Sequence, residues 1–166
     1  EQITWGGLTP VVVTGVTPTI TEIDKEYAVI HMSYVVESMN DKKSHYYQVD
    51  EYYNVTYNRS SETVKLLAFD RYQESFFDSG YISKDRNSIS MGVTNEPAEY
   101  VTSEDYGILA FVRLGQLWMY KYNDSSLTNI FSYPQDSYSD ARTLNTNLDI
   151  NIADMDEDGN IYFVVY

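Results

Sequence analysis

The chain has 166 residues, of which 43% are hydrophobic and 15% aromatic, and its formal net charge is −14. This length allows one domain or two small ones, with a core large enough to fold without cross-links. The charge argues against nucleic-acid binding, which needs a basic stripe. The lack of cysteine excludes disulfides and thiolate chemistry, and no apolar run is long enough to insert directly into a membrane.

Residues 1–100 are predicted to form an irregular all-β region, either propeller-like blades or a small sandwich. Residues 27–38 predict a strand with an apolar row of side chains on one face and a less apolar row on the other, and residues 46–58 and 63–72 supply two more strands. Short polar links join these strands, which predicts an antiparallel meander. The following stretch is less regular: "ESFFDSG" fits a helical turn closed by Gly80, and "SISMGV" fits a short strand.

Residues 101–166 are predicted to form propeller-like hairpins. Three strands are expected in "YGILAFVR", "QLWMYKY" and "LTNIFSY". The last two, "LDINIADMD" and "NIYFVVY", are joined at Asp158-Gly159, a hairpin signal because both central residues tolerate positive φ. Since an apolar edge strand invites aggregation, the final strand is expected to be central or paired. No helix longer than two turns is expected.

Two pairs of segments repeat. "GQLWMYKY" starts at Gly115 and "GNIYFVVY" at Gly159, 44 residues apart. "LLAFDR" starts at Leu66 and "ILAFVR" at Ile108, 42 residues apart. Periods of about 40–45 residues in an all-β chain are typical of four-stranded propeller blades. The alternative is that ordinary hairpins share a β-forming composition.

The segment "ILAFVRLGQLWMYKYNDSSLTNIFSY" resembles a blade of the TolB-like propellers. More loosely, the whole chain resembles part of the extracytoplasmic region of large membrane-anchored envelope proteins of Gram-positive bacteria. The resemblance implies an extracytoplasmic or cell-surface location, with a cytoplasmic one as the alternative, and it transfers no catalytic residues. A closed propeller needs at least four blades, so we expect the chain to be a piece of a longer parent protein, or to self-associate to complete its sheet.

Three aspartates, Asp154, Asp156 and Asp158, precede Gly159 in the pattern D-x-D-x-D-G, which matches the first half of a calcium loop. The match then fails, because Val165 stands where an EF-hand needs a bidentate glutamate, and Tyr162 stands where propeller-type loops place another aspartate. Calcium is therefore the weaker prediction, and a plain acidic hairpin without a cofactor is the stronger one.

Tyrosines crowd the second long strand. Alternation places Tyr47, Tyr53 and Tyr57 on one face, and Tyr46 and Tyr52 on the other. Exposed tyrosines can stack on sugars or peptides, so the first three are candidate ligand-binding residues. The alternative is that they pack across strands within the sheet.

No catalytic residues are predicted. His31 and His45 are expected to be structural or exposed, since nothing local pairs them with a nucleophile and a carboxylate. Acidic pairs occur that could serve as acid and base in glycoside cleavage: Asp50-Glu51, Glu96/Glu99 and Glu104-Asp105.

The sequence favours a non-catalytic binding or scaffolding module with a protein or glycan partner. The alternatives are a carbohydrate- or peptide-binding module that uses the tyrosine-rich strands, and an accessory part of a hydrolase whose active site lies elsewhere.

Overall fold

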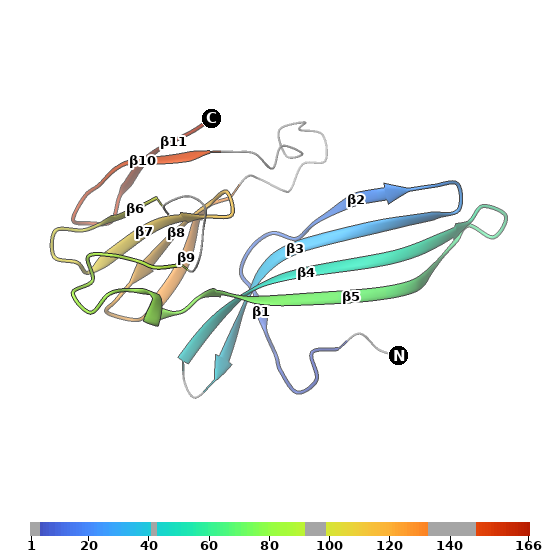
Figure 1. Cartoon of the computed structure of the whole chain (residues 1–166), viewed down its shortest axis with the longest axis horizontal. Helices are drawn as coiled ribbons and strands as arrows, with labels where there is room; N and C mark the ends of the chain where they lie inside the picture. Colours follow the sequence, from blue (N-terminus) through green and yellow to red (C-terminus); the bar gives the residue numbers. More distant parts are fainter. Residues whose placement is uncertain (1–3, 41–42, 92–98, 133–148) are drawn as a thin grey trace. The chain divides into compact units, whose positions relative to one another are not determined.

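The computed structural model describes residues 4–40, 43–91, 99–132 and 149–166. The described residues form an all-β structure in which every strand pairing is antiparallel, with one short 3₁₀ turn (Figure 1). The chain divides into two compact units between Phe76 and Phe77, upstream of the predicted division at residue 100. This division falls inside a strand, β5.

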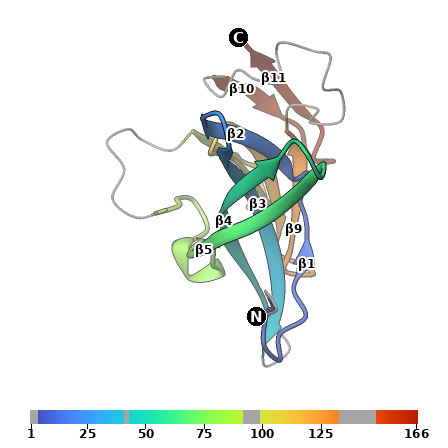
Figure 2. The same cartoon turned by 90° about the vertical axis from the view of Figure 1, so that its right-hand side faces the viewer.

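Unit 1 is built on one five-stranded sheet in which β1 and β2 both pair with β3, and β4 and β5 follow. Its strands are β1 (Val11–Val12), β2 (Thr17–Ile23), β3 (Tyr27–Asn40), β4 (Lys43–Asn58) and β5 (Thr63–Phe77). The predicted three-stranded meander is confirmed, and each strand is at least as long as expected because the polar links are short. The long strands are visibly twisted (Figure 2).

The register of β3 and β4 fixes which side chains share a face. The two strands pair without a break from Tyr27 opposite Thr56 to Asn40 opposite Lys43. One face carries a core cluster of Tyr34, Val36 and Val49 with Met32, Tyr47 and Trp5 packed against it. The opposite face carries the remaining alternate residues of the same strands, among which Val35 and Tyr46 are also buried.

Unit 2 holds a four-stranded sheet in the order β6-β7-β8-β9 and a separate hairpin, β10-β11. Its elements are η1 (Ser79–Tyr81), β6 (Tyr100–Thr102), β7 (Ile108–Arg113), β8 (Gln116–Lys121), β9 (Ser126–Phe131), β10 (Ile150–Met155) and β11 (Ile161–Val165). The predicted strands of the last third are confirmed. The short strand β6 has no counterpart among the predictions.

The irregular stretch differs from its prediction. "ESFFDSG" does not form a helical turn closed by glycine, because β5 continues to Phe77 and the 3₁₀ turn starts only at Ser79. Asp78 caps that turn by accepting a hydrogen bond from the backbone N–H of Gly80 at 2.7 Å. In "SISMGV", Ile89 makes an isolated bridge with Ile82, and the last two residues lie outside the described ranges.

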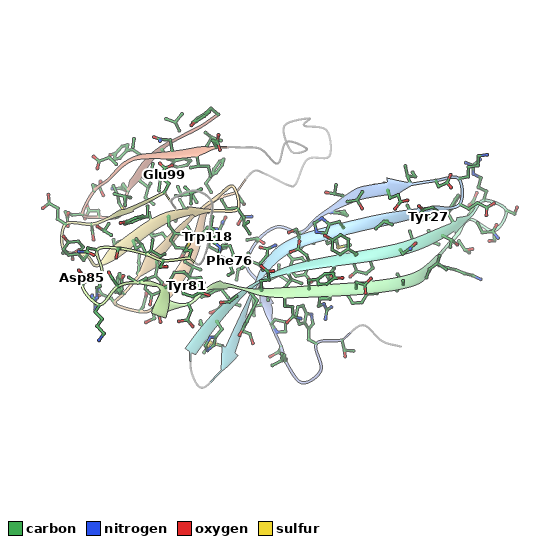
Figure 3. All side chains as sticks on the ribbon, in the orientation of Figure 1. Tyr27, Phe76, Tyr81, Asp85, Glu99 and Trp118 are labelled. Atoms are coloured by element: carbon green, nitrogen blue, oxygen red, sulfur yellow. The ribbon has the colours of Figure 1, made fainter. Side chains whose placement is uncertain are left out.

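The core of unit 2 lies on both faces of the four-stranded sheet. On one face, Phe77 stacks on Phe111 with ring centroids 5.4 Å apart and contacts Tyr120 at 5.0 Å. Trp118, which is labelled in Figure 3, lies on β8 directly opposite Phe111 of β7. Its side chain is fully buried. The hairpin packs against the other face, where the rings of Phe131 and Phe163 lie 5.4 Å apart.

The two tight hairpins of unit 2 use different turns. Between β7 and β8, Leu114 and Gly115 both have positive φ, as a two-residue type I′ turn requires. Between β10 and β11, Gly159 has φ +83° but Asp158 does not have positive φ. The prediction that both residues of this turn adopt positive φ is therefore wrong. A β-carbon at position 159 would lie 3.0 Å from Ile108 Cδ1, so glycine also permits the close approach of the hairpin to the sheet.

Candidate functional site

The face of the long sheet opposite the Val36–Val49 cluster gathers aromatic and acidic side chains. β3 contributes His31, β4 contributes Asp50 and Tyr52, and β5 contributes Asp70 and Tyr72. The register sets His31 directly opposite Tyr52, and the last four side chains line one shallow depression. We call these five residues the acidic tyrosine face.

Contacts within the acidic tyrosine face hold its side chains in place. His31 Nε2 lies 2.8 Å from Asp50 Oδ1, and the imidazole stacks on the Tyr52 ring at 4.6 Å and 18°. Tyr72 meets Tyr52 edge-on, with centroids 6.0 Å apart. Tyr52 is 36% exposed and Tyr72 61% exposed, so both rings remain accessible while the histidine positions one of them.

The histidine–aspartate pair is not joined to a nucleophile among the described contacts. Ser33 is the serine nearest in register, opposite Asp50 on β4, but its Oγ accepts a hydrogen bond from Gln48 Nε2 at 2.7 Å. A nucleophilic site needs the histidine to contact the carboxylate through one ring nitrogen and the nucleophile through the other. The arrangement instead orients an aromatic surface.

The tyrosines predicted as ligand-binding residues lie elsewhere. Tyr47 and Tyr53 share a face as expected, but it is the packed one: Tyr47 borders the core, and the Tyr53 ring lies 5.0 Å from that of Phe69. Packing within the sheet, the alternative to ligand binding, therefore applies to both Tyr47 and Tyr53. Tyr57 is 45% exposed and lines a separate depression among turn residues that include Asp24 and Arg59.

Sequence reasoning missed Tyr52, Tyr72, Asp50, Asp70 and His31 as a group. The available signal was the alternation of side chains along β4, which directs Tyr52 and Tyr53 to opposite faces of the sheet. The neighbours of Tyr52 on β3 and β5 depend on the pairing register, which no single strand reveals.

The packed face of unit 1 holds a buried ion pair, which we call the Glu51–Arg71 clasp. Glu51 is 4% exposed. Arg71 Nη2 lies 2.6 Å from Glu51 Oε1, and Tyr53 donates its hydroxyl to Oε2 at 2.8 Å. The guanidinium also stacks 4.0 Å from the Trp5 ring and donates to the backbone carbonyl of Thr4. The clasp thereby fastens the segment that contains Trp5 to the sheet.

Burial around the clasp shifts two tyrosine pKa values. Burial is the largest cause that raises the pKa of Tyr53, to about 12, and the hydrogen bond to Glu51 adds to it. The pKa of Tyr34 is raised further, again mainly by burial and then by the charge of Glu51. Both hydroxyls therefore stay protonated at neutral pH.

The acidic pairs that the sequence offered for glycoside cleavage make other contacts in the described residues. Asp50 and Glu51 lie on opposite faces of the sheet, because neighbours on a strand alternate. Glu99 accepts a hydrogen bond from the backbone N–H of Ile152. Asp105 is held by Ser103 Oγ, 2.6 Å away, and this bond is the main cause that lowers its pKa. Glu96 lies outside the described ranges.

In the last hairpin, the carboxylates of Asp154 and Asp156, two of the three calcium candidates, accept hydrogen bonds from nearby residues. Asp156 Oδ1 accepts backbone hydrogen bonds from Asp158 at 3.1 Å and Asn160 at 2.8 Å, and its Oδ2 accepts from the Asn160 side chain. These bonds, above all that of the Asn160 side chain, lower the pKa of Asp156. Asp154 Oδ1 accepts from the backbone N–H of Met155. In the described residues, no three acidic or histidine side chains converge as a metal cage requires.

Comparisons with models of protein families, with curated proteins and with solved structures give no match. Within the part of the chain that the structure describes, no helix is long and apolar enough to cross a membrane.

Proposed function

We propose that the chain is a non-catalytic binding module and that its acidic tyrosine face binds a basic segment of a partner protein. The observation that carries this proposal is the depression in which two carboxylates, Asp50 and Asp70, adjoin two exposed rings, Tyr52 and Tyr72. A lysine or arginine side chain suits this combination, because its charge pairs with carboxylates and also lies favourably on an aromatic face.

The net charge of −14 supports the same partner chemistry. A strongly acidic module attracts basic partners over distance and accelerates their association, and the attraction weakens with salt. The rings contribute the part of the affinity that salt screens least. The depression is shallow and open, which suits a segment of a partner that lies along the strands better than an enclosed small molecule.

We further propose that the module is propeller-like and belongs to an extracytoplasmic envelope protein of a Gram-positive bacterium. The four-stranded antiparallel sheet of β6 to β9 supports its interpretation as a propeller blade, since a blade is a sheet of this kind. The repeated segments at Gly115 and Gly159 support it as well, because both contribute strands of unit 2.

Titration with an oligolysine peptide tests the basic-partner proposal. The backbone amide resonances of Asp50, Tyr52, Asp70 and Tyr72 should shift on addition of oligolysine and stay in place on addition of oligoglutamate. The double variant Asp70→Asn/Tyr72→Ala should bind roughly tenfold more weakly, since it loses one ion pair and one cation–π contact that together contribute about 1.4 kcal/mol.

The control is Asp24→Asn/Tyr57→Ala, which removes one carboxylate and one tyrosine from the other depression. It changes the net charge equally and should leave binding unaltered. Equal weakening in the two variants would mean that oligolysine follows net charge alone, and the proposed face would be wrong. Shifts at the same four residues with a neutral oligosaccharide, and none with oligolysine, would assign the face to glycans.

A further inference from the structure

The open strand edges of this molecule are protected in different ways. β5 carries charges along its length, at Lys65, Asp70, Arg71 and Glu74. β2 contains Pro18 and a register shift after Ile20, and the pairing of β8 with β9 shifts beside Leu117. β1 and β6 have only two and three residues. Charge, proline, bulges and shortness are the devices that keep edges from pairing with other chains.

β11 has none of these devices. Its residues Ile161–Val165 carry no charge and no proline, and the irregularity in its pairing lies on β10, between Ile152 and Asp154. Among the described residues β11 pairs only with β10. Tyr162 is 59% exposed and Val164 56% exposed on its outer face.

The hydrogen bonds of the hairpin show which backbone N–H and C=O groups of β11 do not bond to β10. Asp149 and Tyr166 exchange both backbone bonds, at 3.2 and 3.1 Å. In an antiparallel pair the bonded positions recur every second residue, so Val164 bonds to Asn151 across the hairpin. The N–H and C=O groups of Phe163 and Val165 therefore point away from β10. On the far side of the hairpin, the outward N–H of Ile152 already bonds to Glu99.

We propose that β11 pairs antiparallel with β11 of a second copy of this chain, with Phe163 opposite its own counterpart. In this register the outward backbone N–H and C=O groups of Phe163 bond to those of Phe163 in the second copy, across a two-fold axis. The outward groups of Ile161 bond in the same way to those of Val165 of the second copy. Tyr162 lies opposite Val164 of the second copy. A two-fold interface uses the same surface twice, so one self-complementary strand satisfies both copies.

Charge favours a second copy of this strand over other surfaces of the same protein. A chain with a net charge of −14 repels its copies at most points of contact. Residues 160–166 contain no ionisable side chain except tyrosine, so pairing them places no like charges opposite each other. The contact is a single strand pair, smaller than a stable dimer needs, so we expect a weak monomer–dimer equilibrium.

Sedimentation and amide hydrogen exchange over a wide range of protein concentration test this proposal on the full chain. Dimers should form as concentration rises. The amides of Ile161, Phe163 and Val165 should gain protection with concentration, while that of Val164 stays protected throughout by β10. A concentration-independent monomer, or a gain in protection spread equally over neighbouring residues, would overturn the proposal.

Two double variants at the exposed positions distinguish specific strand pairing from nonspecific hydrophobic association. Tyr162→Lys/Val164→Lys sets lysine opposite lysine at both ends of the contact and should abolish the dimer. Tyr162→Lys/Val164→Glu sets lysine opposite glutamate and should preserve it. Loss of the dimer in both variants, or its survival in both, would contradict the proposed register. Circular dichroism checks that each variant remains folded.

Discussion

Two nearly identical segments occupy opposite environments in the two units. "LLAFDR" lies in β5 of unit 1, where Leu67 is 62% exposed. "ILAFVR" lies in β7 of unit 2, where the equivalent Leu109 is fully buried. The local sequence makes a strand in both cases, but burial depends on whether a second layer covers it. In unit 2, the β10-β11 hairpin and Phe77 provide that cover.

The two units are accordingly stabilised by different interactions. Unit 2 has an aromatic and aliphatic core on both faces of its sheet, so hydrophobic burial dominates. Unit 1 has an apolar cluster around Val36 and Val49, and farther along the same face it places the Glu51–Arg71 clasp. A buried ion pair stabilises only while both partners are present, since one partner alone leaves an uncompensated charge.

Removing one partner of the clasp should give the largest effect in unit 1. Arg71→Met should lower the free energy of unfolding of this unit by about 4 kcal/mol, because Glu51 stays buried without its cation. Chemical denaturation monitored at resonances of β3 and β4 measures the loss. The double variant Glu51→Leu/Arg71→Met should recover most of it. If the double variant is as unstable as the single one, packing on Trp5 rather than charge is the stabilising term.

The matched leucines of the repeated segment should differ sharply. Leu109→Ala should cost unit 2 about 3 kcal/mol, through lost burial and the cavity that remains. Leu67→Ala should change the free energy of unfolding by less than about 0.5 kcal/mol, as an exposed substitution does. Denaturant titrations of the two variants measure the difference. Equal losses would show that Leu67 is covered in solution, and the contrast between the units would fail.

Alkaline pH should weaken unit 1 through Tyr53. Its folded pKa, about 12, lies above the ordinary value of 10.0, so the unfolded state loses this proton first. The stabilisation is complete below pH 10 and is lost as pH rises toward 12. Tyr53→Phe should therefore flatten the decline in stability across this window, an effect that thermal melts at several pH values can resolve. If stability falls equally steeply with pH in the Tyr53→Phe variant, the fall is due to other groups such as Tyr34.

The strands were predictable because alternation and turn chemistry are local properties. Residues 27–38 and 46–58 follow a period of two, and Asp158-Gly159 correctly marks the last hairpin. The 3₁₀ turn after Asp78 was not predictable in detail, because tertiary packing of Phe77 extends β5 at the expense of a helical turn.

The candidate site was less predictable than the strands. Alternation correctly separated Tyr52 from Tyr53, but it could not say which face would be covered. That depends on Trp5, a residue far away in sequence that packs beside the tyrosine-rich strand. The three aspartates near the end allowed two interpretations, because a carboxylate that closes a turn and one that binds calcium follow the same spacing.

The placement of Trp5 and Trp118 has a spectroscopic consequence. They are the two tryptophans of the chain, and each unit contains one. Trp118 is fully buried, so its fluorescence should be blue-shifted and shielded from dissolved quenchers. Trp5 lies against a guanidinium in a half-buried position, so quenchers should reach it. Replacing either one with phenylalanine would leave a label-free reporter for the unit that keeps its indole.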